Sequence, residues 1–206
     1  KHYAQYQRNN YDMKTIDHDF DHLPDYLEEM LNTNPNYWDT DGDLVCDYFE
    51  ITNELNALNS SDADLDLDSD GLNNYEEYIH SSSPWDTDTD DDGLNDKLEV
   101  EIGTYPNSPD SDMDSLPDFW EYHYGTNPTK NDTAEDIDHD GITNIDEYRL
   151  GLEPNNPDTD HDLFKDSWDP DPLNPYNPII IIIVSTIIVT TVLLTNIRLT
   201  KERSVI

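Results

Sequence analysis

The stretch DLDSDGLNNYEE, residues 66–77, sets three aspartates at alternate positions and a glutamate seven residues after the third. A second stretch, DIDHDGITNIDE at residues 136–147, has the same spacing. Each is a twelve-residue frame with oxygen-bearing side chains at positions 1, 3, 5, 9 and 12, which is the spacing of a loop that wraps a cation. The pattern therefore predicts a fold built from cation-binding loops.

The frame occurs seven times, and we number the loops one to seven. They begin at Asp17, Asp39, Asp66, Asp88, Asp110, Asp136 and Asp158, so the intervals are 22, 27, 22, 22, 26 and 22 residues. A nearly constant period of this length indicates a linear array of repeated units rather than one large core.

Every loop fills the same ligand positions. Positions 1, 3 and 5 are aspartate, position 7 is apolar and coordinates through its backbone carbonyl, position 9 is Asp or Asn, and position 12 is Glu except in loop seven. The predicted ligands are Asp17, Asp19, Asp21, Leu23, Asp25 and Glu28; Asp39, Asp41, Asp43, Val45, Asp47 and Glu50; Asp66, Asp68, Asp70, Leu72, Asn74 and Glu77; Asp88, Asp90, Asp92, Leu94, Asp96 and Glu99; Asp110, Asp112, Asp114, Leu116, Asp118 and Glu121; Asp136, Asp138, Asp140, Ile142, Asn144 and Glu147; Asp158, Asp160, Asp162, Phe164, Asp166 and Asp169.

Calcium is the ion that this ligand set favours. All predicted ligands are hard oxygens without clustered Cys or His, which argues against Zn²⁺ and Cu²⁺, and flexible carboxylate loops suit Ca²⁺ better than the tight octahedron of Mg²⁺. We expect up to seven Ca²⁺ ions, one for each loop. Because the carboxylates repel one another without a cation, we expect ion binding and ordering to be coupled.

The residue at position 6, where the loop turns most sharply, separates the loops by expected quality. Glycine accepts such a turn without strain, and it stands there as Gly71, Gly93 and Gly141. The other loops have His22, Leu44, Ser115 and Leu163, so we expect weaker sites or a different bend. Loop seven, which also ends in the shorter Asp169, is the loop we expect to bind most weakly.

A short helix is predicted to begin within each loop and to end soon after it. Gly103, Gly125, Gly151 and Asn32 suit a left-handed helix C-cap, and Pro35, Pro106, Pro128 and Pro154 bar continuation. Helices of about two turns are marginal alone, so apolar residues beside the loops must join neighbouring units. The predicted apolar residues are Tyr26, Leu27, Tyr48, Phe49, Leu98, Phe119 and Trp120. The expected fold class is a repeat array of calcium-binding loops with short helices and little regular sheet, plus one C-terminal transmembrane α-helix.

Composition limits the classes of partner. The formal net charge is −38 and only 10 residues are Lys or Arg, which excludes nucleic acid as a natural partner, because phosphate binding needs clustered basic residues. The single cysteine, Cys46, cannot form an internal disulfide, and we expect its role to be packing or incidental.

The ends of the chain differ from its middle. The polar stretch KHYAQYQRNN has no signal-peptide character, and residues 1–16 are predicted to be a linker from an upstream region. Repeats occupy residues 17–169, a Pro-rich spacer residues 170–178, and residues 179–197 form a run of 19 uncharged residues. That run gives about 28 Å of helix, close to one hydrocarbon core, and it predicts a transmembrane helix.

The charges beside this run set its predicted orientation. Arg198, Lys201 and Arg203 follow it, whereas the spacer before it has no basic residue. The positive-inside rule then places the tail, residues 198–206, in the cytoplasm. We expect a single-pass protein of the cell membrane, with its N-terminus and repeats outside the cell.

The units DTDTDDDGLNDKLEVEIGTYP (residues 86–106) and DIDHDGITNIDEYRLGLEPNNPDTD (residues 136–160) closely resemble thrombospondin type 3 repeats, in the form found in prokaryotic surface proteins. The resemblance covers residues 17–169. It implies a wire-like array of calcium loops that serves as a spacer, stalk or adhesive module. Disulfides of the vertebrate members have no counterpart here. Dockerin modules share the 22-residue unit and imply a cohesin partner, but they pair two loops with longer helices.

Three classes of function compete. The leading hypothesis is a membrane-anchored stalk that calcium stiffens and that presents an upstream domain. A second hypothesis makes the array a calcium-dependent adhesion module that binds surface or matrix ligands. The third is an enzyme, because DTDTD at residues 86–90 resembles the nucleophile motif of haloacid dehalogenase-type phosphatases. That motif needs a preceding strand and a doubly wound sheet, so we expect no enzymatic activity.

Overall fold

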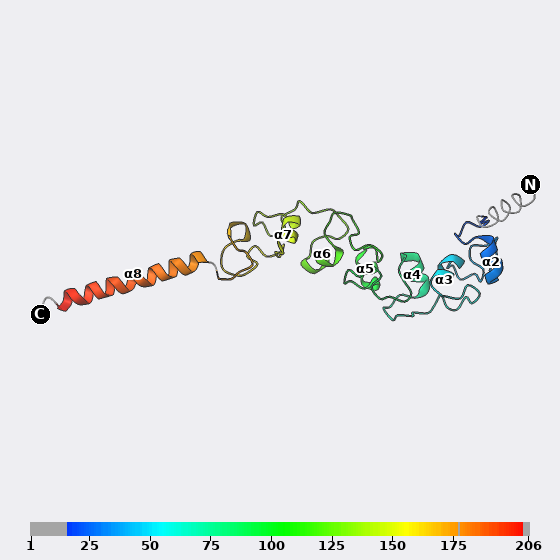
Figure 1. Ribbon diagram of the computed structural model, residues 1–206, viewed down its shortest axis with the longest axis horizontal. Coiled ribbons are helices and arrows are strands. Elements are labelled where there is room, and N and C mark those ends of the chain that lie inside the picture. Colours follow the sequence, from blue (N-terminus) through cyan, green and yellow to red (C-terminus); the bar gives the residue numbers. More distant parts are fainter. Residues whose placement is uncertain (1–15, 177, 204–206) are drawn as a thin grey trace, which may run out of the picture. The chain divides into compact units, whose positions relative to one another are not determined.

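The computed structural model describes residues 16–176 and 178–203. The predicted linker, apart from its last residue, and the last three residues of the predicted tail lie outside this range. The helices are α2 (Asp25–Leu31), α3 (Asp47–Thr52), α4 (Asn74–His80), α5 (Asp96–Ile102), α6 (Asp118–Tyr124), α7 (Asn144–Leu150), the 3₁₀ turn η1 (Asp166–Trp168) and α8 (Pro178–Arg203). Figure 1 shows no strand in the described part of the chain. The prediction of short helices with little sheet is confirmed.

The chain divides into two compact units, which we describe separately. The first runs to Ser111 and includes Pro117–Phe119, and the second comprises Asp112–Leu116 and the chain from Trp120 onward. Loops one to four and α2 to α5 therefore belong to the first unit, and loops six and seven with α7 to the second. The boundary runs through loop five and α6.

Each short helix begins at position 9 of its loop, because one backbone hydrogen bond closes the loop there. The N–H of Asn74 donates to the carbonyl of Leu65, the residue before position 1, at 2.8 Å, and the N–H of Asp96 donates to Thr87 in the same way at 3.1 Å. Three helices end as predicted at left-handed caps, with Asn32 after α2, Gly103 after α5 and Gly151 after α7. Loop and helix thus form one local structural element.

The cores are small and repeat with the loops. The position-7 side chains of the first five loops are almost fully buried, whereas Ile142 and Phe164 are half-buried. Aromatic rings join successive helices within a unit. Phe49 of α3 meets Tyr78 of α4 edge-on with ring centres 5.2 Å apart, and Trp120 of α6 meets Tyr148 of α7 at 5.3 Å. The predicted packing of neighbouring repeats through aromatic residues is confirmed for these two pairs.

The helix α8 differs from the others in length and surroundings. Its side chains are described over residues 182–195, and nine large apolar ones between Ile182 and Leu194 are exposed. The sequence predicts a membrane-spanning helix at residues 179–197. Within the described residues, however, no helix combines the length and the apolar character that crossing a membrane requires.

Candidate metal centres

The aspartates at positions 1, 3 and 5 converge in space. In loops one, two and three, one oxygen from each of these aspartates lies within 4.8 Å of the others. Backbone hydrogen bonds hold the carboxylates in place: in all seven loops the position-7 N–H donates to Oδ1 of the position-5 aspartate, at 2.6–2.9 Å. Seven further groups of at least three potential ligand residues are present. Several clusters of Asp and Glu could therefore hold a metal ion.

The loops turn through two left-handed residues. Position 6 has φ of 108–110° where it is glycine and 77–84° where it is His22, Leu44, Ser115 or Leu163. The turn therefore has the same hand in all seven loops, with a smaller φ at the four non-glycine residues. Position 4 is also left-handed in every loop, although only Gly42 is a glycine there. In loops one to three its N–H donates to Oδ1 of the position-1 aspartate, as from Phe20 to Asp17 at 2.7 Å, and this hydrogen bond favours the conformation despite its steric cost.

The glutamates at position 12 are almost completely buried. Their exposure is 0–1% for Glu28, Glu50, Glu77, Glu99, Glu121 and Glu147. In Glu28, Glu50 and Glu147 both carboxylate oxygens are buried without a hydrogen-bond partner. Among the described residues, the ion pairs do not include these three glutamates. A buried, unpaired carboxylate is costly, so this arrangement calls for a cation or a proton.

Burial and like charge disfavour the ionised form of these glutamates. Burial is the main cause that raises the pKa of Glu50 to about 9, with the charges of Asp43 and Asp41 adding to it. The same combination, burial followed by Asp138 and Asp140, raises the pKa of Glu147 to about 8. Without a cation these groups hold protons at neutral pH, and a bound cation would compete with those protons.

Glu28, Glu50, Glu77 and Glu147, all at position 12, lie near acids of the following segment as well as of their own loop, at places that we call junctions. In one junction Glu77 is grouped with Asp70, at position 5 of the same loop, and with Asp96, at position 9 of the next loop. Asp70 Oδ2 also accepts the N–H of Lys97 from the next loop, at 3.0 Å. The junction carboxylates thus come from both neighbouring loops, a convergence that the sequence did not predict because it joins residues 26 apart.

A second junction uses a residue outside the predicted ligand frame. Asp43 and Glu50 of loop two are grouped with Asp62, which precedes loop three by four residues. In the second unit Asp132, at the same place before loop six, donates its N–H to Asp114 Oδ2 at 3.2 Å. The sequence offered one signal for these two aspartates: both lie in the longer intervals of 27 and 26 residues.

Loop seven closes differently from the others. The turn η1 follows it in place of an α-helix, and Asp169 is half-buried. Position 5, Asp162, still accepts the N–H of Phe164 at 2.9 Å. The first half of the frame is therefore formed in loop seven, while its closing half lacks a fully buried glutamate.

Cys46 has a structural place in the first unit. It is the N-cap residue of α3, its sulfur accepts the N–H of Phe49 at 3.4 Å, and burial raises the pKa of its thiol. A buried thiol with a raised pKa is a packing residue rather than a reactive one. The sequence-based expectation for Cys46 is confirmed.

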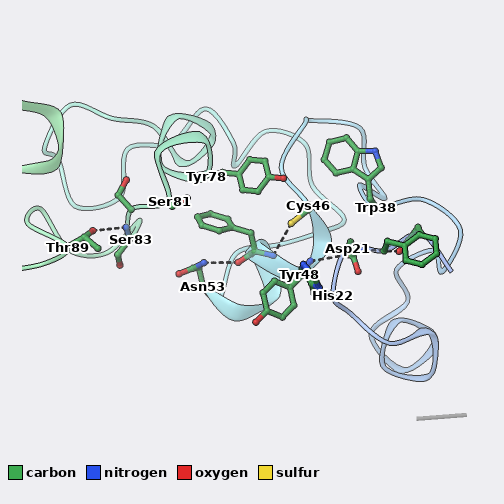
Figure 2. Close-up of a pocket in the computed structure, with 14 residues that line it drawn as sticks. Asp21, His22, Trp38, Cys46, Tyr48, Asn53, Tyr78, Ser81, Ser83 and Thr89 are labelled. Carbon is green, nitrogen blue, oxygen red and sulfur yellow. Dashed lines mark hydrogen bonds between the residues drawn. The ribbon is translucent and has the colours of Figure 1, made fainter. Parts of the chain in front are cut away.

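A cavity of about 710 Å³ lies beside loop one in the first unit (Figure 2). Its aromatic lining consists of Phe20, Trp38, Tyr48, Phe49 and Tyr78. Asp19 and Asp21 line it too, and these residues also belong to the loop-one cluster. In Figure 2, Trp38 and His22 lie toward one end and Ser83 and Thr89 toward the other. The size and the mixed aromatic and polar lining are those of a small-molecule site.

Comparisons with protein-family models, curated proteins and solved structures gave no match for this chain.

Proposed function

We propose that this chain is a calcium-binding repeat module that serves as a stalk, anchored in a membrane through α8. The observation that carries the proposal is the buried row of position-12 glutamates, three of which have no hydrogen-bond partner for either carboxylate oxygen. Such groups are stable in a folded chain when a cation neutralises them. The resemblance of residues 17–169 to thrombospondin type 3 repeats supports the same function.

Calcium is the proposed ion on chemical grounds. The groups that converge are carboxylates, and the predicted frame adds amide oxygens and backbone carbonyls, which together suit a hard cation with six to eight ligands. Seven divalent ions, one for each loop, would change the formal net charge from −38 to −24. Ions at the junctions would reduce it further and tie each loop to the next. Filling the sites would therefore order individual units and stiffen the array.

The membrane anchor is the part of the proposal that rests on α8. Nine exposed large apolar side chains in a helix make a surface that is unfavourable in water. Residues 179–197 contain no charged residue, and three basic residues follow them, which supports a single span with the repeats outside the cell. The proposal includes no catalytic role.

One experiment tests ion binding and stiffening together. Small-angle scattering and circular dichroism of residues 1–178 would be recorded in calcium and in a chelator, with magnesium as the control ion. We expect helix content to rise and the particle to extend and stiffen in calcium. If neither the particle dimensions nor the helix content change with calcium, the hypothesis of a calcium-stiffened stalk is rejected.

A separate measurement tests the anchor. The full chain and a chain ending at residue 178 would be mixed with lipid vesicles and extracted at alkaline pH. The full chain should stay with the vesicles, and the shortened chain should be released. Equal release of both would reject the anchor while leaving ion binding untouched.

The cavity beside loop one favours a second candidate function, calcium-dependent adhesion. Exposed aromatic side chains such as Trp38 and Tyr48 offer contact area for a surface or matrix ligand. Because Asp19 and Asp21 belong to both the cavity and the loop-one cluster, ligand binding there would depend on calcium. Beads coated with the repeats should then aggregate in calcium, and Trp38→Ala should abolish the aggregation. If beads coated with the Trp38→Ala variant still aggregate in calcium, adhesion does not depend on this cavity.

A further inference from the structure

The junctions are of two kinds, which differ at three places in the following loop. In loops two, four, five and seven the residue four before position 1 is proline, position 2 has a hydroxyl and position 9 is aspartate. Loops three and six have aspartate, an aliphatic residue and asparagine at these places. In the first kind the residues are Pro35, Thr40 and Asp47; Pro84, Thr89 and Asp96; Pro106, Ser111 and Asp118; and Pro154, Thr159 and Asp166. In the second kind they are Asp62, Leu67 and Asn74; and Asp132, Ile137 and Asn144.

The first kind places its carboxylate through a relay of two side chains. The N–H of Ser83, after α4, donates to the hydroxyl of Thr89 at 2.8 Å. Thr89 in turn donates its N–H and its hydroxyl to the two oxygens of Asp96, at 2.8 and 2.7 Å. The relay holds the Asp96 carboxylate beside Glu77 and Asp70.

The second kind replaces the relay with one residue. The N–H of Asn56, which follows α3 as Ser83 follows α4, donates directly to Asp62 Oδ2 at 2.8 Å. Asn74, at position 9, donates its side-chain amide to the carbonyl of Asp62 at 2.8 Å. Asp62 therefore occupies the place that Thr89 and Asp96 fill together in the other kind.

The second unit repeats this arrangement. The N–H of Asn127 donates to Asp132 Oδ2 at 3.0 Å. The side-chain amide of Asn144 donates to the Asp132 carbonyl at 3.1 Å and to its Oδ1 at 3.3 Å. At two independent places in the chain, therefore, position 9 is asparagine and the aspartate stands instead four residues before position 1 of the same loop.

The carboxylates around Asp62 lack the donors that a dry acidic cluster needs. Glu50 is 1% exposed and neither of its oxygens has a hydrogen-bond partner, and Asp62 is 8% exposed with Oδ1 unpartnered. One oxygen each from Asp43, Glu50 and Asp62 lies within 4.8 Å of the others. Oxygens so close and so poorly solvated repel one another unless a cation or a proton lies between them, and a cation would compete with the proton.

We propose that Asp62 and Asp132 are metal ligands that take the place of the position-9 aspartate at two junctions, with Asn74 and Asn144 orienting them. The inference rests on the proposed calcium-binding function and adds ligands outside the repeated frame. It also explains the longer intervals, because each adds residues before the loop from which an aspartate can reach the preceding glutamate.

The test counts bound calcium ions in the full chain by native mass spectrometry at one fixed free calcium concentration. Asp62→Asn keeps an acceptor for the Asn56 N–H but removes the charge, and it should lose one ion. The matched control is Asp64→Asn, because Asp64 is exposed and two residues away. This control should keep every ion. Asp132→Asn provides the same measurement at the second place.

A rescue variant tests the exchange itself. Adding Leu67→Thr and Asn74→Asp to Asp62→Asn rebuilds the first kind of junction and should restore the lost ion. The inference is overturned if Asp62→Asn keeps every ion, if it loses several, or if the rescue variant does not regain one. If the unaltered chain binds no calcium, the proposed function fails instead, so the two failures are distinguishable.

Discussion

Loops six and seven, both in the second unit, share a first half and differ in the second. The position-5 N–H donates to the position-3 aspartate at 3.0 Å in loop six and at 3.1 Å in loop seven. Loop six then ends in Glu147, which is 0% exposed and lies within the helix α7. Loop seven ends in the half-buried Asp169, after a 3₁₀ turn of three residues.

The neighbour of each loop accounts for much of this difference. Asp140 Oδ2 in loop six accepts the N–H of Ser167 from loop seven at 3.0 Å. The corresponding oxygen of Asp162 is buried without a partner. The aspartate triplet is therefore a local product of the twelve-residue frame, whereas closure of the loop depends on the following helix and the next loop.

Removing the cation should have the largest effect, and it should reverse the direction in which stability changes with pH. Burial and the charges of Asp138 and Asp140 raise the pKa of Glu147 from 4.5 to about 8. In a chelator the folded state then holds protons that the unfolded state has released, so stability present below pH 4.5 is lost as the pH rises through about 8. In calcium the trend should reverse, because coordination requires the ionised carboxylate.

Thermal unfolding followed by circular dichroism at pH 5 and pH 8, in chelator and in calcium, measures this effect. A site at a hundredfold its Kd adds about 2.7 kcal/mol, so several sites should raise the midpoint at pH 8 by more than about 10 °C. Hydrogen exchange in residues 136–147 should respond more than in residues 158–169. The same pH trend with and without calcium would contradict the role given to Glu147.

Neutralising the closing residue of each loop should give the next largest effect. Glu147→Gln removes a buried ligand, at a cost comparable to breaking a buried ion pair, about 3 kcal/mol or on the order of a hundredfold in calcium affinity. Asp169→Asn should weaken loop seven only a few-fold, because Asp169 is half-buried. Calcium titrations followed by hydrogen exchange in each loop would compare the two variants. Equal losses of calcium affinity would contradict the difference between loops six and seven.

The sequence predicted the local half of this contrast. The frame, the short helices and the caps at Asn32, Gly103 and Gly151 all follow from residue type and spacing. The sequence did not predict that position 4 is left-handed, because a left-handed residue is expected from sequence mainly where glycine stands. At Phe20 the hydrogen bond to Asp17 favours that conformation instead.

The junctions could not be predicted from the frame alone. Asp70, Glu77 and Asp96 meet because successive loops pack on one another, and spacing within one repeat says nothing of that packing. Asp62 was outside every predicted ligand set, although its position in a longer interval distinguished it. The membrane-spanning helix predicted at residues 179–197 stays a prediction, since its test lies in lipid rather than in the repeats.

Lengthening the closing residue of loop seven should narrow the difference between the loops by a smaller amount. Asp169→Glu adds one methylene and lets the carboxylate reach further into the loop. One charge-assisted contact, less the cost of ordering a longer side chain, amounts to about 1 kcal/mol, or roughly a fivefold gain in affinity. A calcium titration measured by hydrogen exchange in residues 158–169 would detect it. Unchanged affinity would place the defect in η1 rather than in side-chain length.

The smallest expected effect comes from the left-handed residue at position 6. Leu163 has φ of 84° and is 90% exposed, so Leu163→Gly relieves backbone strain while losing almost no packing. A left-handed non-glycine residue costs about 1–2 kcal/mol, and the greater freedom of glycine in the unfolded chain offsets part of the gain. We therefore expect the local stability of loop seven to rise by about 0.5–1 kcal/mol. Hydrogen exchange in residues 158–169 would measure this rise.

The control for this strain argument is Leu163→Ala, which keeps a Cβ and should bring no gain. The reverse change in loop six is Gly141→Ala. A Cβ there would lie 3.7 Å from the Ser167 hydroxyl oxygen, an ordinary contact, so any cost comes from the φ of 110° rather than from crowding. If Leu163→Gly and Leu163→Ala behave alike, strain at position 6 does not contribute to the difference. The weakness of loop seven would then lie entirely in how it closes.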